Sequence, residues 1–584
     1  MLVMWSACRS TKHWPGLLGL VLLLLPLTAL ANNLQLTLEP ENSQVRQNIE
    51  AYLGEVLDRN SREMRRYARF ARRDIERALE ALGYYNYELT LQVEEGQPAR
   101  LQVQINLGEP VVLAKVNLQL LGEASEQPTF IRPSEVQLQP GQALNHGRYE
   151  AAKRQFRNQA LSYGYFASRF QRQELLIDPE AGTAEINLVF DSGPRFRLGE
   201  VIFDHDGILD EAFLQRFVHF SAGMPYHTDD LTELSRQLRA SGYFSEVFVD
   251  AKTDQANQDL QVPVAVLLRN RKPRTLNLGL GFSTDIGPRV TAGWVQHWVN
   301  PWGLRRGVDA QVSEPQQNLS GWYEFPLNPP TTDKLRVSAS LDNERFSVQQ
   351  SRRYGARVQW FHRQQNGWER VLSLRGEREE YQVAQDEGVS WLTLPGIGYG
   401  LLNSDRRVDP TRGYRLQVQL EGAKENQFSE VDLLQLTLTA RGLVTLADHH
   451  RFLARLRAGA TATNDFSRVP ASLRFFAGGD QSVRGYGYQE ISPEDDEGNL
   501  TGGRYLATLG LEYQYAFAER WRWAWFADAG ESVAAVDDLD EWKVGVGTGI
   551  RWISPLGPVR LDVAKGLDEA IGGWRLHFTL GPEI

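Results

Sequence analysis

Cysteine is almost missing from this chain of 584 residues, in which Cys8 is the only one. Cys8 precedes an apolar segment near the N-terminus, so we expect it to be removed when the chain is exported. The remaining chain then has no thiol, which excludes disulfide bonds, thiolate-ligated zinc and a cysteine nucleophile. Such a chain is suited to crossing an oxidising compartment in an unfolded state.

The sequence also lacks a run of 18 apolar residues after position 31, so we predict no transmembrane helix there. Residues 1–31 have the parts of a signal peptide: a basic start with Arg9 and Lys12, an apolar core at 17–27, and Ala29-Leu30-Ala31. We predict cleavage before Asn32. An uncleaved membrane anchor is the alternative, but the apolar run is short for a span.

An exported chain without a transmembrane helix is either soluble or a closed β-barrel, because only helices and closed barrels satisfy their backbone hydrogen bonds in lipid. The mean hydropathy of -0.40 allows both. The 15 Trp, 20 Tyr and 25 Phe, which concentrate toward the C-terminal half, favour a barrel with aromatic girdles. The net charge of -10 gives no reason to expect binding to nucleic acid.

A pattern of about 80 residues recurs three times between residues 32 and 272. In each copy an amphipathic helix ends in a glycine and two aromatic residues, at Gly83-Tyr84-Tyr85, Gly164-Tyr165-Phe166 and Gly242-Tyr243-Phe244. We expect each glycine to cap its helix in the left-handed region, and the aromatics to start a strand and join the core. Two alternating strands follow each helix.

The predicted order is therefore strand, helix, helix, strand, strand, repeated in α+β domains at residues 32–108, 109–194 and 195–272. A sheet of three strands leaves edge strands exposed, and an exposed edge can take up an extended client chain. We hypothesise that the repeats handle clients in this way, so that truncating the third repeat abolishes client handling while the barrel still inserts.

Residues 273–584 contain sixteen segments in which apolar and polar residues alternate. This pattern predicts a 16-stranded antiparallel transmembrane β-barrel with lipid outside and a polar lumen. In residues 414–421 one face is wholly apolar and the other wholly polar, and residues 574–580 show the same alternation. A soluble sandwich is the alternative, but it does not normally need so many long two-faced strands flanked by Trp and Tyr.

One predicted connection, at about residues 463–503, is much longer than the others and contains Val483-Arg484-Gly485-Tyr486. An arginine in a loop that folds back into the lumen needs a carboxylate partner, because burying an unpaired charge is costly. Asp528 is the candidate: in Phe526-Ala527-Asp528-Ala529-Gly530 it shares a face with Phe526 and Gly530. From the residues alone, a solvated loop arginine remains the alternative.

These motifs resemble the outer-membrane assembly superfamily that includes BamA, TamA and the two-partner secretion transporters. The resemblance implies that Arg484 enters the barrel and pairs with Asp528, and that the repeats are POTRA (polypeptide-transport-associated) domains. Residues 409–413 resemble its mid-barrel turn, and residues 551–562 its hairpin between the antepenultimate and penultimate strands. Three repeats, residues 474–480 and the C-terminal residues 580–584 resemble the TamA branch. Many barrel proteins end in an aromatic residue, whereas the last aromatic here, Phe578, is not terminal, which is a further point of resemblance to this branch.

The same resemblance implies a function in the Gram-negative outer membrane, with the POTRA domains in the periplasm. It implies a factor that helps to insert or secrete autotransporters and other β-barrel clients, with unfolded outer-membrane proteins, the lipid bilayer and a TamB-like inner-membrane-anchored periplasmic protein as partners. Lipid transport between the membranes with that partner is one alternative. A polypeptide-secreting pore of the two-partner type is another.

Glycines weaken both ends of the predicted barrel, because Gly279 and Gly281 lie in its first strand and Gly572-Gly573 precede its last. We therefore predict a weakly paired lateral seam, which opens to template client strands. The seam residues are predicted to be Leu278, Gly279, Leu280, Gly281, Leu576 and Phe578.

Catalytic motifs are missing: the sequence has no Gly-x-Ser-x-Gly, no phosphate-binding loop and no His-Glu-x-x-His. We predict no enzymatic activity, no cofactor and no metal, and we interpret His449-His450 as an exposed pair. A hydrolase built on a barrel is the alternative from another functional class, and an assay of the purified barrel for hydrolysis distinguishes the two.

Overall fold

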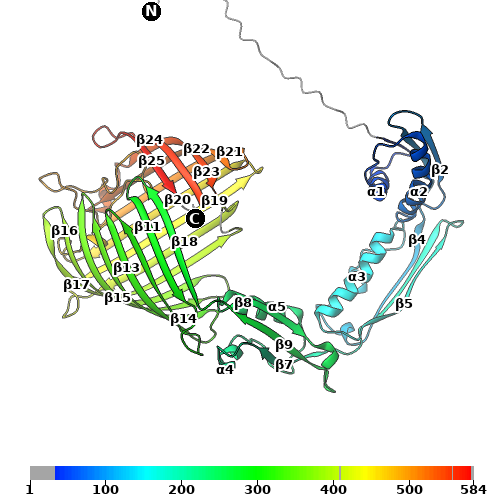
Figure 1. The fold of residues 1–584 in the computed structure, drawn as a ribbon, viewed down its shortest axis with the longest axis horizontal. Coiled ribbons are helices and arrows are strands. Elements are labelled where there is room, and N and C mark those ends of the chain that lie inside the picture. The colour runs from blue at the N-terminus through cyan, green and yellow to red at the C-terminus, as the bar shows by residue number, and fades with distance from the viewer. Residues whose placement is uncertain (1–32, 407–408, 555–556, 581–584) are drawn as a thin grey trace, which may run out of the picture. The chain divides into compact units, whose positions relative to one another are not determined.

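The computed structural model describes residues 33–406, 409–554 and 557–580, so the predicted signal peptide and residues 581–584 lie outside the described residues. The contacts divide the chain into two compact units, residues 1–195 and 196–584. The first unit contains two of the small repeats, and the second contains the third repeat and the barrel (Figure 1). No helix among the described residues has the length and the apolar character needed to cross a membrane.

Each repeat has a three-stranded mixed sheet in which the first strand runs parallel to the third and the second lies antiparallel to the third. The elements are β1 (Leu34–Glu39), α1 (Ser43–Leu53), α2 (Ser61–Glu80), β2 (Glu88–Glu94) and β3 (Arg100–Asn106); β4 (Val112–Leu121), α3 (His146–Ser162), β5 (Arg169–Asp178) and β6 (Thr183–Asp191); and β7 (Arg197–Asp204), α4 (Glu211–Gln215), α5 (Thr228–Ala240), β8 (Phe244–Ala251) and β9 (Gln261–Asn270).

Local sequence accounts for these small domains. In the first repeat, α2 begins with a capping box between Asn60 and Glu63, and its face with Ile75 and Leu79 packs against the inward residues of β3. The glycines that end α2, α3 and α5 have φ angles of +88°, +79° and +78°. Only glycine adopts such angles without strain, so the predicted caps are confirmed.

The second repeat departs from the predicted order, because it has one α-helix instead of two. Two short 3-10 turns, Glu123–Ser125 and Pro133–Glu135, stand where the first helix was expected. Pro128, Pro133 and Pro140 interrupt this segment, and proline removes a donor that a helix needs. In the third repeat the first helix, α4, has only five residues.

The barrel closes with sixteen strands, as predicted, and each strand pairs antiparallel with its neighbours. The strands are β10 (Arg274–Ser283), β11 (Gly287–Gln296), β12 (Arg305–Ser313), β13 (Gln316–Pro326), β14 (Asp333–Arg345), β15 (Gln349–Arg363), β16 (Glu369–Val383), β17 (Asp386–Ser404), β18 (Arg412–Ala423), β19 (Leu433–Leu446), β20 (His450–Thr463), β21 (Tyr505–Ala518), β22 (Trp521–Val533), β23 (Lys543–Ser554), β24 (Gly557–Gly566) and β25 (Trp574–Leu580).

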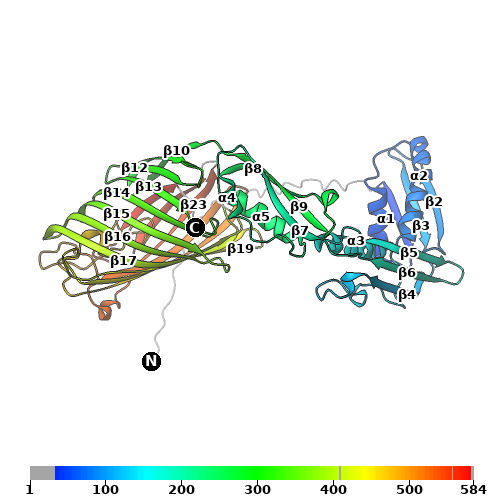
Figure 2. The same ribbon diagram turned by 90° about the horizontal axis from the view of Figure 1, so that it is seen from below.

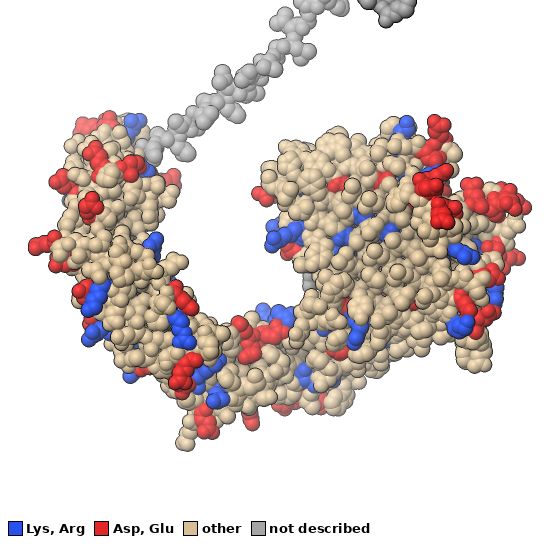
Figure 3. Space-filling model, turned by 180° about the vertical axis from the view of Figure 1, so that it is seen from behind, with Lys and Arg blue, Asp and Glu red and all other residues tan. Residues whose placement is uncertain are grey.

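The two faces of the barrel wall differ in chemistry. Three residues of β22 are exposed on the outer face: Trp521, Trp523 and Trp525. Ala524 and Phe526, which point to the opposite face of the strand, are buried. On the face shown in Figure 3, much of the wall is uncharged, and charged side chains of the barrel gather toward its rim. An apolar outer face and a polar lumen are what a lipid-embedded barrel requires.

The third repeat is joined to one end of the barrel (Figure 2). The Tyr243 hydroxyl donates a hydrogen bond of 2.6 Å to the Gly303 carbonyl in the turn between β11 and β12, and the Asp210 amide donates to Pro301. Burial raises the pKa of Tyr243 well above its ordinary value, so it remains a neutral donor. Tyr243 therefore attaches its repeat to the barrel rim.

Replacing Gly303 by alanine should loosen this attachment. Gly303 has a φ of +75°, and a Cβ there would lie 2.5 Å from a ring carbon of Phe213. We expect overpacking and backbone strain to cost about 1–3 kcal/mol, measured as faster limited proteolysis of the third repeat. Gly367→Ala is the matched control, because Gly367 has a similar φ of +87° and no atom closer than 3.5 Å. Equal protection of both variants would contradict the prediction.

Candidate functional site

The long loop between β20 and β21 lies inside the barrel. Its residues contact strands on several sides of the lumen: Ser472 bonds to Glu379 of β16, the Leu473 carbonyl accepts from Gln435 of β19, and Arg484 reaches β22. Val483 and Tyr486 have no exposed surface. A single loop meets these distant strands only from within the lumen that they enclose.

The structure brings Arg484 and Asp528 together. The Nε of Arg484 donates to Asp528 Oδ2 at 2.6 Å, Nη2 donates to Oδ1 at 3.1 Å, and the Arg484 amide also donates to this carboxylate at 3.2 Å. The guanidinium carbon lies 3.4 Å from the centre of the Phe526 ring. Both charged side chains are almost completely buried. A bidentate pair with this geometry fixes the direction of the loop as well as its position.

Two further carboxylates complete the partners of Arg484, and the sequence analysis did not identify them as site residues. Nη1 donates to Glu512 of β21 at 2.9 Å and to Asp562 of β24 at 3.1 Å. Two more arginines balance the charge. Arg551 of β23 binds Glu512 and Asp562, and Arg455 of β20 binds Asp528 at 3.1 Å.

The cluster therefore contains three guanidinium groups and three carboxylates. A neutral set of this kind is tolerated in a dry interior, whereas removal of one member leaves an uncompensated charge. Since five of the six members belong to strands, the barrel wall forms a preformed receptor for one loop arginine. We define Arg484, Arg455, Arg551, Asp528, Glu512 and Asp562 as the lumen charge cluster.

Glycines, which have no side chain, let the loop backbone approach the barrel wall. A Cβ on Gly545 of β23 would collide with the Arg484 carbonyl, and one on Gly485, whose φ is +94°, would lie 2.4 Å from the Gly566 amide. The Tyr486 hydroxyl donates to the Val544 carbonyl at 3.0 Å, which fixes the other side of the motif. Gly530 does not bring the loop backbone close to the wall. A Cβ there would meet Thr508 and Ala507 of the neighbouring strand β21, and not the loop.

Asp409, in the predicted mid-barrel turn, holds a second group of charges. It accepts from Arg451 of β20 at 2.6 Å and from both terminal nitrogens of Arg522 of β22. Arg451 is only 2% exposed. This turn therefore joins strands that are not its neighbours.

Among the described residues, the first and last strands of the barrel share one register pair. All ten residues of β10 pair with β11, whereas one, Ser283, pairs with a described residue of β25, Thr579. Of the predicted seam residues, Leu278 and Leu280 are 74% and 80% exposed, and Leu576 is 56% exposed. The ring of Phe578 packs against Phe282 at 5.5 Å. Gly279 and Gly281 pair with Thr291 and Arg289 of β11.

The chain was compared with known families and structures. A model of the Omp85 superfamily domain matches residues 275–584. The chain belongs to the Omp85 superfamily. A second model, described as POTRA domain TamA domain 1, matches residues 35–107. Membership in the Omp85 superfamily, together with the barrel, identifies an outer-membrane β-barrel protein with N-terminal POTRA domains.

Relatives of this Omp85 protein include two outer membrane protein assembly factors BamA. That of Nitratidesulfovibrio vulgaris is 24% identical over 443 residues, which cover 72% of this chain and 55% of the relative. That of Neisseria meningitidis serogroup B is 22% identical and covers 83% of this chain and 69% of the relative. The chain thus spans little more than half of the first relative.

A similar solved structure is BamA from Haemophilus ducreyi lacking POTRA domains 1–3. It has a TM-score of 0.68 and 17% identity, and the alignment covers 80% of this chain and 99% of that one. At this identity the likeness concerns the fold.

Two groups of side chains bear on the alternative of a catalytic or metal site. His449 is exposed, whereas His450 is half-buried at the start of β20, where its Nδ1 lies 2.8 Å from the Tyr513 hydroxyl, so the expectation of an exposed pair holds for His449 alone. Asp285, Asp480 and His577 are the one group with three metal-type ligands that we find among the described residues. These three side chains bond to the protein and to one another, so their approach requires no cation.

Proposed function

We propose that this protein assembles β-barrel clients in the outer membrane by opening the seam between β10 and β25. The observation that supports the proposal is that these strands share a single register pair among the described residues. An unpaired strand edge presents a row of backbone donors and acceptors that an incoming strand can satisfy. The exposed apolar side chains of β10 then keep the client strand at the level of the lipid.

The edge strands of the POTRA sheets supply the second part of this mechanism. In each sheet the central strand is the third in sequence, so the first and second strands are both edges. We propose that clients pair transiently with these edges before they reach the seam. The printed name of the relatives, outer membrane protein assembly factor, supports a role in assembly.

We further propose a TamB-like inner-membrane-anchored partner, because the first repeat matches a TamA-type POTRA domain. Affinity purification of the tagged full chain from membranes tests this. We expect a large periplasm-spanning protein to be recovered with the intact chain and to be lost when residues 33–108 are deleted. Equal recovery from both samples, or recovery from neither, would remove the partner from the proposal.

A polypeptide-secreting pore makes a different prediction for ion flow. The lumen holds the long loop, which is bound on several sides by the contacts described above. We expect low single-channel conductance for the native chain and a several-fold increase when residues 466–502 are replaced by a short Gly-Ser linker. High conductance of the native chain, unchanged by this replacement, would favour the pore.

A further inference from the structure

The seam has few backbone hydrogen bonds of its own among the described residues. The Thr284 amide donates to the Phe578 carbonyl at 3.1 Å, and the Phe578 amide donates to the Thr284 hydroxyl at 2.8 Å. Both bonds lie beside the single register pair of Ser283 and Thr579. Side-chain contacts from the long loop add to these bonds.

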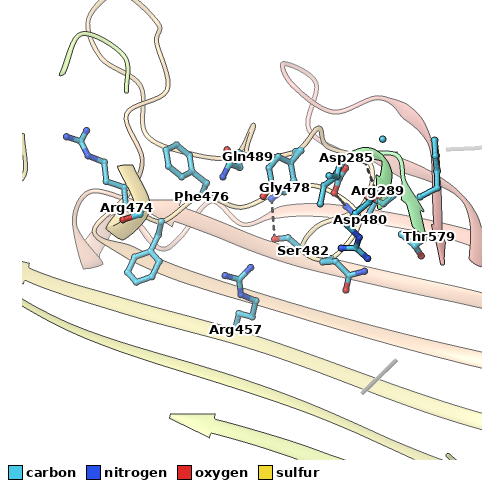
Figure 4. A pocket seen from close by; sticks show the side chains of 18 of the residues that line it. Asp285, Arg289, Arg457, Arg474, Phe476, Gly478, Asp480, Ser482, Gln489 and Thr579 are labelled. Atoms are coloured by element: carbon cyan, nitrogen blue, oxygen red, sulfur yellow. Dashed lines mark hydrogen bonds between the residues drawn. The ribbon is translucent and has the colours of Figure 1, made fainter. Parts of the chain in front are cut away.

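Asp480 of the long loop supplies contacts to the β10 side. Its carboxylate accepts from the Thr284 hydroxyl at 3.1 Å and from the Asp285 amide at 3.3 Å, and its own amide donates to Asp285 Oδ2 at 2.6 Å (Figure 4). Asp480 is 4% exposed. A Cβ on the preceding Gly479 would lie 2.5 Å from the Asp285 carboxylate, so only glycine permits this approach.

His577 connects the same loop to β25. Its Nδ1 lies 2.5 Å from Asp480 Oδ1, and its Nε2 lies 3.0 Å from the amide of Gly485. Because a backbone amide only donates, Nε2 must accept, and the proton is therefore on Nδ1, which donates to Asp480. The ring thus binds the loop at two points, and one of them adjoins Arg484.

We propose that Asp480 fastens the two seam strands to each other, so that the position of the loop controls whether the seam is closed. We call Thr284, Asp285, Asp480 and His577 the seam clasp. This inference rests on the proposed lateral opening and adds the contacts that regulate it. Since Arg484 anchors the same loop in the lumen charge cluster, movement of the loop releases the seam.

The seam clasp also holds a proton. Asp285 lies in the turn between β10 and β11, where burial and the neighbouring Asp480 carboxylate raise the pKa of Asp285 to about 7. Besides Asp480, the charged or titratable groups around it are His577 of β25, Tyr488 of the long loop and Arg289 of β11. Arg289 and Tyr488 line the same cavity of about 610 Å³ (Figure 4). A closed clasp therefore takes up a proton that a solvated Asp285 gives up.

The sign of the pH effect follows from this uptake. A carboxyl with a raised pKa in the closed state favours closure at low pH, and this contribution is lost as pH rises through about 7. Between pH 6 and pH 8 the ratio of open to closed seam should increase about tenfold. Asp285→Asn should abolish this dependence, because it keeps the oxygen that accepts from Asp480 but does not titrate.

Pulsed electron paramagnetic resonance on the full chain tests the seam clasp without a client. Nitroxide labels at Leu280→Cys and Leu576→Cys report the distance between β10 and β25, since both side chains are exposed on the outer face. We expect one short distance for the unaltered clasp at pH 6. In Asp480→Ala a longer distance should appear, with at least a tenfold gain in the open population.

Glu490→Ala is the matched control, because Glu490 is also a loop carboxylate and binds Arg575 of β25 at 2.7 Å but makes no described bond to β10. It should leave the distances unchanged. If Asp480→Ala does not fold, as judged by heat-modifiable gel mobility, Thr284→Val removes the hydroxyl donor instead and should also open the seam.

An unchanged distance distribution in a folded Asp480→Ala or Thr284→Val variant would overturn the clasp. That result would leave lateral opening itself intact, because the proposed function is tested separately by covalent closure of the seam in the presence of clients.

Discussion

Replacing Arg484 by methionine should release the long loop from the barrel wall and abolish client assembly. The substitution keeps an extended side chain but leaves Asp528, Glu512 and Asp562 with only Arg455 and Arg551. One buried negative charge then has no partner. Breaking a buried ion pair in this way costs about 3–5 kcal/mol. This loss is enough to reverse a local equilibrium between inserted and released loop.

Protease sensitivity of residues 464–504 measures loop release, and insertion of newly made β-barrel proteins in reconstituted membranes measures assembly. Arg484→Lys should be intermediate, since one ammonium group does not reproduce a bidentate bond to Asp528 together with contacts to Glu512 and Asp562. The prediction is wrong if Arg484→Met leaves the loop protected and assembly at its normal rate.

A double substitution separates charge balance from specific geometry. Arg484→Met combined with Asp528→Asn removes one charge of each sign, so the remaining groups of the lumen charge cluster carry no net charge. We expect the protein fold to recover much of the lost stability, because the penalty of the single variant comes from the unpaired carboxylate. Assembly should stay low, since the loop is still not anchored to β22.

A disulfide between Ser283→Cys and Thr579→Cys should stop client assembly almost completely. These two positions form the register pair of the seam, so their Cα atoms lie at the spacing of neighbouring strands. A covalent bond there prevents β10 and β25 from separating. We expect loss of more than about nine-tenths of assembly, with full recovery on reduction, if opening is obligatory.

The control disulfide joins β10 to its other neighbour. Leu278→Cys and Ala292→Cys are register partners in β10 and β11, a pair of strands that is bonded along its whole length. Crosslinking them restricts nothing that the mechanism requires, so assembly should be unchanged. Undiminished assembly in the oxidised Ser283→Cys/Thr579→Cys variant would sink the proposed function, whatever the state of the seam clasp.

Features that depend on local chemistry were predicted well. Alternation of period two located sixteen strands, and the predicted last strand, residues 574–580, is β25 as observed. The three glycine caps follow from the steric freedom of glycine in the left-handed region. The sequence also contains the reason why the second repeat has one helix instead of two, because three prolines stand where the first helix was expected.

The pairing of Arg484 with Asp528 has a different status. The residues alone suggested only that a loop arginine in a lumen needs a carboxylate, and the family resemblance supplied the choice of partner. The structure brings the two side chains together, while their role in assembly stays a prediction. The sequence offered one further hint: charged residues such as Glu512 and Arg551 interrupt otherwise apolar strands.

By itself, then, the sequence determined which segments are strands, which face of each meets lipid, and where the long loop begins. Only the tertiary structure decided the companions of Arg484 and the contacts of Asp480 with Thr284 and His577. The reason is geometric. A closed barrel of tilted strands sets which residues share a level through the stagger summed over all its strands, and no local pattern encodes that sum.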